Sequence, residues 1–302
     1  MQRYDCIIAG GGPAGLTAGI YACRAGLKTL LIESTYPGGQ IVNAHMLENY
    51  PGFPQGIPGS DFGTLLEEQA TRFGLEIEYD QITDFDLIGD VKRVVTASGS
   101  FEGRTVILCM GSQPKRLGIE GEERFSGRGV SFCATCDGNF FAGKDVAVIG
   151  GGDTACSDAL YLARIVNKVY VVHRRDQLRA QQHLAKQVVE HPRIEVLWDT
   201  QLQCIEGEEQ VQSILVQKNG HQQSEKVPVS AAFIAVGTLP MTDVLNGVLE
   251  LDADGYIVTD AHMRTSIPGV YAAGDIRATV LRQVITAAAD GAVAAMAAGE
   301  YI

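Results

Sequence analysis

The stretch Tyr4 to Gly15 reads YDCIIAGGGPAG, and it decides the fold that the sequence predicts. Its apolar first half is typical of a short buried strand, and the glycines that follow have the spacing G-x-G-x-x-G. In such a loop Gly10 makes the tight turn, Gly12 lets the backbone approach a pyrophosphate, and Gly15 allows a helix to pack closely. The stretch therefore predicts a strand, a turn and a helix.

Beyond this helix a second apolar strand, Thr29 to Ile32, ends in Glu33, which lies 18 residues after Gly15. An acid about 20 residues beyond the glycines holds a ribose hydroxyl in dinucleotide-binding units. A glycine motif alone is weak and is also typical of a plain structural turn. The order of strand, turn, helix, strand and acid favours a dinucleotide site.

The same pattern recurs 140 residues later, where the strand Asp145 to Ile149 runs into Gly150-Gly151-Gly152-Asp153-Thr154-Ala155. The residue equivalent to Glu33 is His173, the first of the segment His173-Arg174-Arg175-Asp176-Gln177-Leu178-Arg179. A carboxylate suits a free ribose 2′-OH, whereas arginines accommodate a 2′-phosphate. The first unit is predicted to bind an unphosphorylated dinucleotide and the second NADP, although a solvated charged surface is the alternative for these arginines.

A Cys-x-x-Cys pair, Cys133-Ala134-Thr135-Cys136, is followed directly by Asp137. Two such cysteines can close a disulfide ring, and opening the ring takes up two electrons and up to two protons. A helix that begins here would favour the thiolate form, and Asp137 would exchange protons locally. Half of a zinc site has the same spacing, but no second Cys or His pair lies at ligand spacing, so we expect no metal.

The composition limits the classes of function. A chain of 302 residues suits two domains, and the net charge of −12 argues against binding nucleic acid or anionic lipid. The sequence shows neither a signal peptide nor a long apolar run, so we expect a cytoplasmic protein that does not bind membranes. In a reducing compartment the other cysteines are expected to be core residues. They are Cys6, Cys23, Cys109, Cys156 and Cys204.

Both units end in a buried strand followed by Gly-x-x-Pro, at 111–114 and 237–240. We expect the chain to cross between domains at these places. The predicted fold is α/β, with two Rossmann-like, three-layer dinucleotide-binding domains. The first is discontinuous, 1–115 and 242–302, and the second is inserted as 116–241. Segments 91–96 and 211–217 alternate like antiparallel strands.

Near the C-terminus a strand ends on an acid, in Ala272-Ala273-Gly274-Asp275, and an alanine-rich helix is predicted from about Val284 to Ala298. The N-terminus of that helix can face an anion, and Asp275 can accept hydrogen bonds from sugar-like hydroxyls.

Taken together, the sequence resembles low-molecular-weight, bacterial-type thioredoxin reductases over nearly its whole length. The segments that carry the resemblance are the first glycine loop, Gly38-Gly39-Gln40, Glu48-Asn49-Tyr50-Pro51-Gly52, Cys133 to Gly138, His173 to Asp176 with Arg179-Ala180, and Ala272 to Asp275 with Arg282-Gln283. One departure is Cys109-Met110-Gly111, where the family usually has Ala-Thr-Gly beside FAD. Another is Ser157-Asp158, where two glutamates are common.

The resemblance implies an enzyme that uses NADPH and FAD, reduces a thioredoxin or a thioredoxin-like protein, and is a homodimer. Cys133, Cys136 and Asp137 would be its redox and proton-transfer residues, with Cys136 facing the flavin. The implied FAD residues are Gly10, Gly12, Pro13, Ala14, Gly15, Glu33, Gly39, Gln40, Asn49, Gly111, Gly274, Asp275, Arg282, Gln283 and Val284. The implied NADPH residues are Gly152, Asp153, Thr154, His173, Arg174, Arg175 and Arg179.

In this family the NADPH site and the cysteines share one domain and take turns at the flavin of the other, so we expect rotation about 112–118 and 238–245. Two enzymatic alternatives are the flavoprotein component of a peroxide-reducing system and a thioredoxin reductase fed by ferredoxin. A non-catalytic redox sensor is a third. The first normally has extra N-terminal domains, and the arginine cluster argues against the second.

Overall fold

A computed structural model describes residues 3–44, 46–221, 223–245 and 247–302. The chain divides into two compact units: Met1–Gln113 with Leu239–Ile302, and Pro114–Thr238. The domain boundaries expected from the sequence, 115/116 and 241/242, lie two or three residues away from these divisions.

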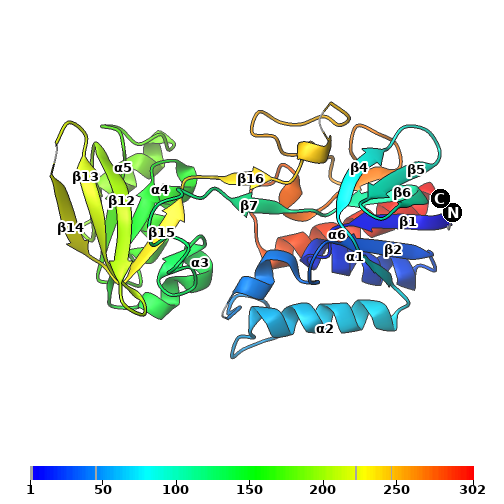
Figure 1. The fold of residues 1–302 in the computed structure, drawn as a ribbon, viewed down its shortest axis with the longest axis horizontal. Coiled ribbons are helices and arrows are strands. Elements are labelled where there is room, and N and C mark those ends of the chain that lie inside the picture. The colour runs from blue at the N-terminus through cyan, green and yellow to red at the C-terminus, as the bar shows by residue number, and fades with distance from the viewer. Residues whose placement is uncertain (1–2, 45, 222, 246) are drawn as a thin grey trace. The chain divides into compact units, whose positions relative to one another are not determined.

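The first unit is built on a seven-stranded sheet in the order β3-β2-β1-β6-β5-β4, with β17 paired to β6 (Figure 1). The strands β1, β2, β3, β6 and β17 are parallel, whereas β4 and β5 are antiparallel. The long β6 accepts β5 along its first half and β17 along its second half. The strands are β1 (Arg3–Ala9), β2 (Thr29–Glu33), β3 (Glu76–Tyr79), β4 (Ile82–Asp86), β5 (Lys92–Thr96), β6 (Ser100–Leu108) and β17 (Val270–Ala272).

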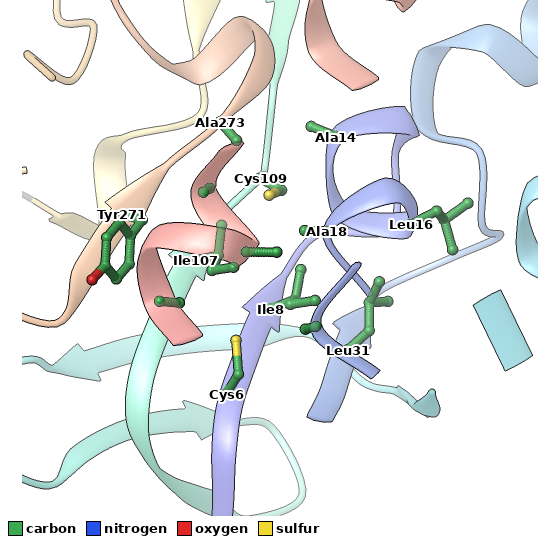
Figure 2. Packing of buried hydrophobic residues seen from close by; sticks show 14 of the residues in the cluster. Cys6, Ile8, Ala14, Leu16, Ala18, Leu31, Ile107, Cys109, Tyr271 and Ala273 are labelled. Carbon is green, nitrogen blue, oxygen red and sulfur yellow. The ribbon is translucent and has the colours of Figure 1, made fainter. Parts of the chain in front are cut away.

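Side chains of β1 alternate between two cores. Cys6 and Ile8 face a core shared with the helices α1 and α6 (Figure 2), while Ile7 and Ala9 face a second core on the other side of the sheet. Small residues let the helices approach closely, because a β-carbon on Gly291 of α6 would lie 2.1 Å from the carbonyl oxygen of Ala14 in α1. The helices are α1 (Pro13–Arg24), α2 (Gly59–Arg72) and α6 (Val284–Tyr301), with short 3₁₀ turns η1 (Gly39–Asn43), η3 (Asp243–Leu245) and η4 (Gly274–Ile276).

The second unit has a five-stranded parallel sheet in the order β11-β10-β9-β15-β8 and a separate antiparallel sheet, β12-β13-β14. Val146 and Val148 of β9 face the helices, and Ala147 and Ile149 face the core that includes the antiparallel sheet. The strands are β8 (Val130–Ser131), β9 (Asp145–Gly150), β10 (Lys168–Val172), β11 (Ile194–Leu197), β12 (Thr200–Gly207), β13 (Val211–Lys218), β14 (Ser224–Pro228) and β15 (Ala231–Ala235). The helices are α3 (Ala134–Asp137), α4 (Asp153–Leu162) and α5 (Gln182–Glu190), with the 3₁₀ turn η2 (Gly138–Phe141).

The predicted α/β fold with two Rossmann-like units is confirmed, and the antiparallel segments expected at 91–96 and 211–217 are β5 and β13. The two chain crossings form a two-stranded sheet of β7 (Ser112–Pro114) and β16 (Thr238–Pro240). Among the described residues, no helix is both long and apolar enough to span a membrane.

Candidate functional site

The first glycine loop has the geometry that its sequence predicts. Gly10 has φ of +103°, and a β-carbon there would lie 2.5 Å from the carbonyl oxygen of Cys109. A β-carbon on Gly15 would lie 1.9 Å from the carbonyl oxygen of Gly10, so only glycine lets α1 start this close to the strand. Over Gly12 the nearest atom to such a carbon is Cα of Gly39, 4.0 Å away. The loop therefore leaves an open cradle at Gly12.

Glu33 is held beside this cradle. Its Oε2 accepts a hydrogen bond from the backbone N–H of Gly11 at 2.7 Å, and its Oε1 accepts one from the backbone N–H of Thr35 at 2.9 Å. The half-buried carboxylate thus stands at the end of β2, next to the glycines. The Ser34 and Thr35 hydroxyls also donate to Oε1, at 3.3 and 3.2 Å, whereas Oε2 accepts only the Gly11 bond among the described residues and so keeps a lone pair for a ribose hydroxyl.

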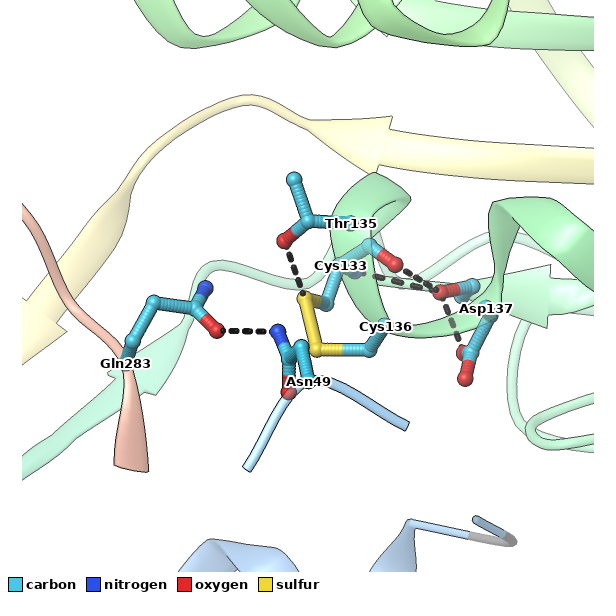
Figure 3. Close-up of a disulfide and its surroundings, with 7 residues drawn as sticks. Asn49, Cys133, Thr135, Cys136, Asp137 and Gln283 are labelled. Carbon is cyan, nitrogen blue, oxygen red and sulfur yellow. Dashed lines mark hydrogen bonds between the residues drawn. A yellow bond between two sulfur atoms is a disulfide. The ribbon is translucent and has the colours of Figure 1, made fainter. Parts of the chain in front are cut away.

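Two distant segments of the first unit meet the glycine loop, and a hydrogen bond joins two others. A β-carbon on Gly274 would lie 2.9 Å from Cβ of Ala14, and one on Gly39 would lie 3.1 Å from Cα of Gly12. The Nδ2 of Asn49 donates a hydrogen bond to Oε1 of Gln283 at 2.9 Å (Figure 3). Gln283 also caps α6, whose first residue is Val284. The close approaches explain why Gly39 and Gly274 lack side chains.

Asp275 lies in the turn after β17, and burial raises the pKa of its carboxyl to about 6, against the opposing effect of the Arg282 guanidinium. That guanidinium lies 4.0 Å from the ring centroid of Tyr256, and its Nε is a buried donor without a hydrogen-bond partner in the described residues. Buried donors are normally satisfied. An acceptor from a bound ligand fits this donor.

Asp290 was not predicted, yet it anchors the same turn. Its Oδ2 accepts hydrogen bonds from the backbone N–H of Gly274 at 3.2 Å and from Arg277 at 3.1 Å. The sequence carries a signal for it, since Asp290 is the single charged residue between 284 and 299 of the alanine-rich helix. Gln40 is exposed in η1, and Gly111 is half-buried directly before the next strand, which begins at Ser112. Residues of the first unit therefore fit a dinucleotide at the cradle.

In the second unit Cys133 and Cys136 form a disulfide, with an S–S distance of 2.12 Å and a Cα–Cα distance of 5.3 Å (Figure 3). The Sγ of Cys133 lies 3.4 Å from Oγ1 of Thr135. The helix expected at this pair exists, but α3 has only four residues and ends at Asp137, with Gly138 as its C-cap. So short a helix has only a small dipole with which to favour a thiolate.

Ser131, which was not predicted, connects the disulfide to Asp137. Its hydroxyl donates a hydrogen bond to Oδ2 of Asp137 at 2.6 Å and accepts one from the backbone N–H of Cys133 at 3.1 Å. Ser131 is buried at the end of β8, so it fixes the carboxylate beside the one-turn helix. The arrangement places a proton-exchanging group next to the cysteines.

The second glycine loop repeats the first, with Ala155 in the place of Gly15 and His173 in the place of Glu33. A β-carbon on Gly151 would lie 2.2 Å from Nδ1 of His173, whereas one on Gly152 meets no heavy atom within 4 Å. Gly152 therefore forms an open cradle like Gly12. His173 is buried, and its Nε2 lies 2.9 Å from the carbonyl oxygen of Gln177. Its ring supports the loop from inside.

The arginines of the second unit lie on an irregular loop between β10 and α5, and their side chains are exposed. The backbone N–H of Arg179 donates to the carbonyl oxygen of Gly151 at 2.7 Å, and that of Gln181 donates to Oδ1 of Asp153 at 2.7 Å. The loop is thereby tied to the glycine cradle. Thr154 is exposed on the first turn of α4. Exposed guanidiniums next to an open glycine loop fit a phosphorylated dinucleotide.

Other cysteines behave mostly as core residues. Cys6, Cys109 and Cys156 are buried, and burial raises the pKa of the Cys6 thiol to about 12 and that of Cys156 to about 11. Cys23 and Cys204 are half-buried. Within the described ranges, no three His, Cys, Asp or Glu side chains gather in a way that could hold a metal ion.

Comparisons with known proteins agree along the whole chain. Residues 4–291 match the family model described as pyridine nucleotide-disulphide oxidoreductase. Relatives named thioredoxin reductase include one from Treponema pallidum, 46% identical with 99% of this chain and 97% of the relative covered. One from Bacillus subtilis is 39% identical, with 99% and 95% covered. The crystal structure of thioredoxin reductase from Streptococcus pyogenes is 41% identical, covers 99% of this chain and 98% of that chain, and has a TM-score of 0.93. The chain therefore belongs to the pyridine nucleotide-disulphide oxidoreductase family, and within it to the bacterial-type thioredoxin reductases.

Proposed function

We propose that this chain is an NADPH-dependent flavoenzyme that reduces the disulfide of thioredoxin or of a thioredoxin-like protein. The observation that carries the proposal is the disulfide between Cys133 and Cys136, set in a unit that also has an open glycine cradle and unpaired exposed arginines among its described residues. The near full-length relatives named thioredoxin reductase support it.

The first unit would hold FAD and the second NADPH. The FAD pyrophosphate would bind at the first glycine loop and the start of α1, at Gly10, Gly12, Pro13, Ala14 and Gly15. The adenosine ribose of FAD would bind to Glu33. Further FAD contacts would come from Gly39, Gln40, Asn49, Gly111, Gly274, Asp275, Arg282, Gln283 and Val284. The NADPH pyrophosphate would bind at the second glycine loop, at Gly152, Asp153 and Thr154. The 2′-phosphate of NADPH would bind to Arg174, Arg175 and Arg179, and His173 would support the loop that carries these arginines.

When both are bound, NADPH would supply a hydride donor, and FAD would supply a carrier that accepts the hydride and passes two electrons to a disulfide. The chain's own residues then do three things. The Cys133–Cys136 bond opens as it takes up two electrons, leaving two sulfurs that accept up to two protons. Asp137 exchanges a proton with these sulfurs, held in place by the Ser131 hydroxyl. The reduced pair then breaks the disulfide of thioredoxin by thiol–disulfide exchange, which closes the Cys133–Cys136 bond again.

We further propose a homodimer, as the resemblance implies, and a cytoplasmic location, where a reducing environment would keep the five other cysteines as thiols. Of the alternatives, the arginines favour NADPH over ferredoxin as the electron donor, because ferredoxin needs no 2′-phosphate site. The redox sensor has no support among the residues described.

The test is a comparison of wild type with Cys136→Ser. The yellow wild-type protein should bleach when NADPH is added without oxygen, and it should then reduce thioredoxin. The variant should keep its FAD and still bleach, because flavin reduction does not need the sulfur, but it should reduce no thioredoxin. Loss of FAD from the variant would mean that the pair is structural, and a variant that still reduces thioredoxin would exclude the proposed role of the disulfide.

A further inference from the structure

The arginine loop, residues 173–181, carries three exposed guanidiniums with no hydrogen bond or ion pair among the described residues. Two of them, on Arg174 and Arg175, are neighbours in sequence and repel each other. An irregular nine-residue loop with such side chains would not hold them over one phosphate by itself, because ordering them costs conformational entropy. The geometry of the loop must therefore be fixed through its backbone.

One half of the loop is fixed to the glycine cradle through Arg179 and Gln181, as described above. The other half is fixed to the antiparallel sheet. The Nδ2 of Asn219 donates a hydrogen bond to the carbonyl oxygen of Arg174 at 3.0 Å, and the backbone N–H of Asp199 donates to the carbonyl oxygen of Arg175 at 3.2 Å. Both arginines that would meet the 2′-phosphate first are thus tied by groups from elsewhere in the unit.

Asn219 joins these contacts into one brace. It follows β13, and besides binding Arg174 it donates its backbone N–H to the carbonyl oxygen of Asp199 at 2.6 Å. Its Oδ1 accepts a hydrogen bond from Nε2 of Gln201 at 3.0 Å. Asp199 has φ of +52°, a left-handed conformation that aspartate adopts more readily than most residues other than glycine. The backbone bond from Asn219 helps to hold it there.

We infer that the side chain of Asn219 is a positioning group for coenzyme specificity: it sets the backbone at Arg174, the neighbour of Arg175, so that both guanidiniums meet the 2′-phosphate of NADPH. This inference rests on the proposed function, in which these arginines bind that phosphate. Asn219 itself touches no coenzyme in this role. Replacing Asn219 should therefore weaken the binding of NADPH, which carries the 2′-phosphate, and leave the binding of NADH, which lacks it, unchanged.

Replacing Asn219 by Ala removes the side-chain bonds and keeps the backbone bond to Asp199. The loss of one neutral hydrogen bond from the loop should weaken NADPH binding about three- to tenfold. The KM for NADPH should rise by that factor, with kcat and the KM for NADH unchanged. As a direct probe, 2′,5′-ADP should bind the FAD-loaded enzyme three- to tenfold more weakly, while 5′-AMP binds as before.

Asn167→Ala is the matched control, because the Nδ2 of Asn167 also makes a side-chain bond, to Oδ1 of Asp145 at 2.6 Å, at the start of β9, whereas the arginine loop follows the opposite end of β10. It should leave both probes unchanged. The thermal unfolding midpoints of Asn219→Ala and Asn167→Ala should be equal. If Asn219→Ala lowers kcat with both coenzymes equally, the residue is merely structural and the inference is wrong.

Arg174→Ala separates this inference from the proposed function. If Arg174→Ala weakens 2′,5′-ADP binding and Asn219→Ala does not, the positioning role is refuted while the assignment of the arginines stands. If Arg174→Ala leaves 2′,5′-ADP binding unchanged, the phosphate site is assigned to the wrong residues, and the inference falls with it.

Discussion

Replacing Gly152 by Ala separates the role of a glycine loop in folding from its role in binding. A β-carbon on Gly152 meets no heavy atom within 4 Å, and the residue has φ of −93° and extended ψ, which alanine adopts without strain. As the N-cap of α4, alanine is less favourable than glycine by roughly 0.5–1 kcal/mol, and its lower entropy in the unfolded chain offsets about 0.4–1 kcal/mol. The free energy of unfolding should therefore change by less than about 1 kcal/mol.

Coenzyme binding should change far more, since the open space over Gly152 is where we propose that the NADPH pyrophosphate approaches the backbone. A methyl group there keeps the phosphate away from backbone donors. Losing one charge-assisted hydrogen bond weakens binding by about 1.5–3 kcal/mol, or roughly ten- to a hundredfold. The measurement is the Kd for NADP⁺ by calorimetry on the FAD-loaded protein, together with a urea unfolding curve.

Gly15→Ala is the contrasting variant, since its β-carbon would lie 1.9 Å from the carbonyl oxygen of Gly10. Relieving that clash requires α1 to move from the sheet, which should destabilise the protein by about 1–3 kcal/mol or more and lower its FAD content. Were Gly152→Ala to bind NADP⁺ as tightly as wild type, the second glycine loop would not be the pyrophosphate site, and the reasoning from open space would fail.

Two further predictions concern buried carboxyl groups. Burial raises the pKa of Asp275 to about 6, so this carboxyl binds a proton more tightly in the folded FAD-free protein than in the unfolded chain. The free energy of unfolding of the wild type, relative to that of Asp275→Asn, should therefore fall by roughly 1 kcal/mol between pH 5 and pH 7.5. If the difference in unfolding free energy between the two proteins does not change with pH, the prediction is wrong. Glu122 is 2% exposed and accepts hydrogen bonds from the backbone N–H groups of Leu117 and Gly118 at 3.0 and 2.7 Å, so Glu122→Gln should leave one of them unsatisfied and cost about 1–3 kcal/mol. Amide hydrogen exchange should then accelerate at 117 and 118 and not in β9, and equal acceleration in both would show general destabilisation instead.

The sequence predicted those features that a local rule governs. Gly10 and Gly15 follow from a backbone turn and a close helix contact, and Glu33 follows from its position after the second strand. The repeat of the glycine motif at 150–155 strengthens the prediction of two dinucleotide-binding units, because two copies at a constant offset of 140 residues are improbable in a chain without two such units. Strand and helix periodicity then gave the α/β fold.

What the sequence did not predict depends on contacts between distant residues. Ser131 lies only two residues before Cys133, but no spacing rule links a serine there to Asp137. Asn219 lies 45 residues from Arg174, and only the tertiary fold, which brings the turn after β13 to the arginine loop, joins them. The length of α3 was also not predictable from the cysteine spacing, because the chain changes to a 3₁₀ turn at Gly138.

The crossings between the units show how such contacts alter a prediction made from the sequence. The hinge was expected to span 112–118 and 238–245. In the structure Glu122 binds the backbone at 117 and 118, and Leu245 is fully buried in the core on the far side of the first sheet. Dihedral changes at these end residues would break these buried contacts, whereas backbone bonds at 115 and 241 join the two crossing segments to each other, from Lys115 to Gly237 and from Met241 to Gly111. We therefore expect rotation between the units to be concentrated in 113–116 and 238–241, where β7 and β16 pair with each other and can move as one connection, and not at the anchored residues 117, 118 and 245.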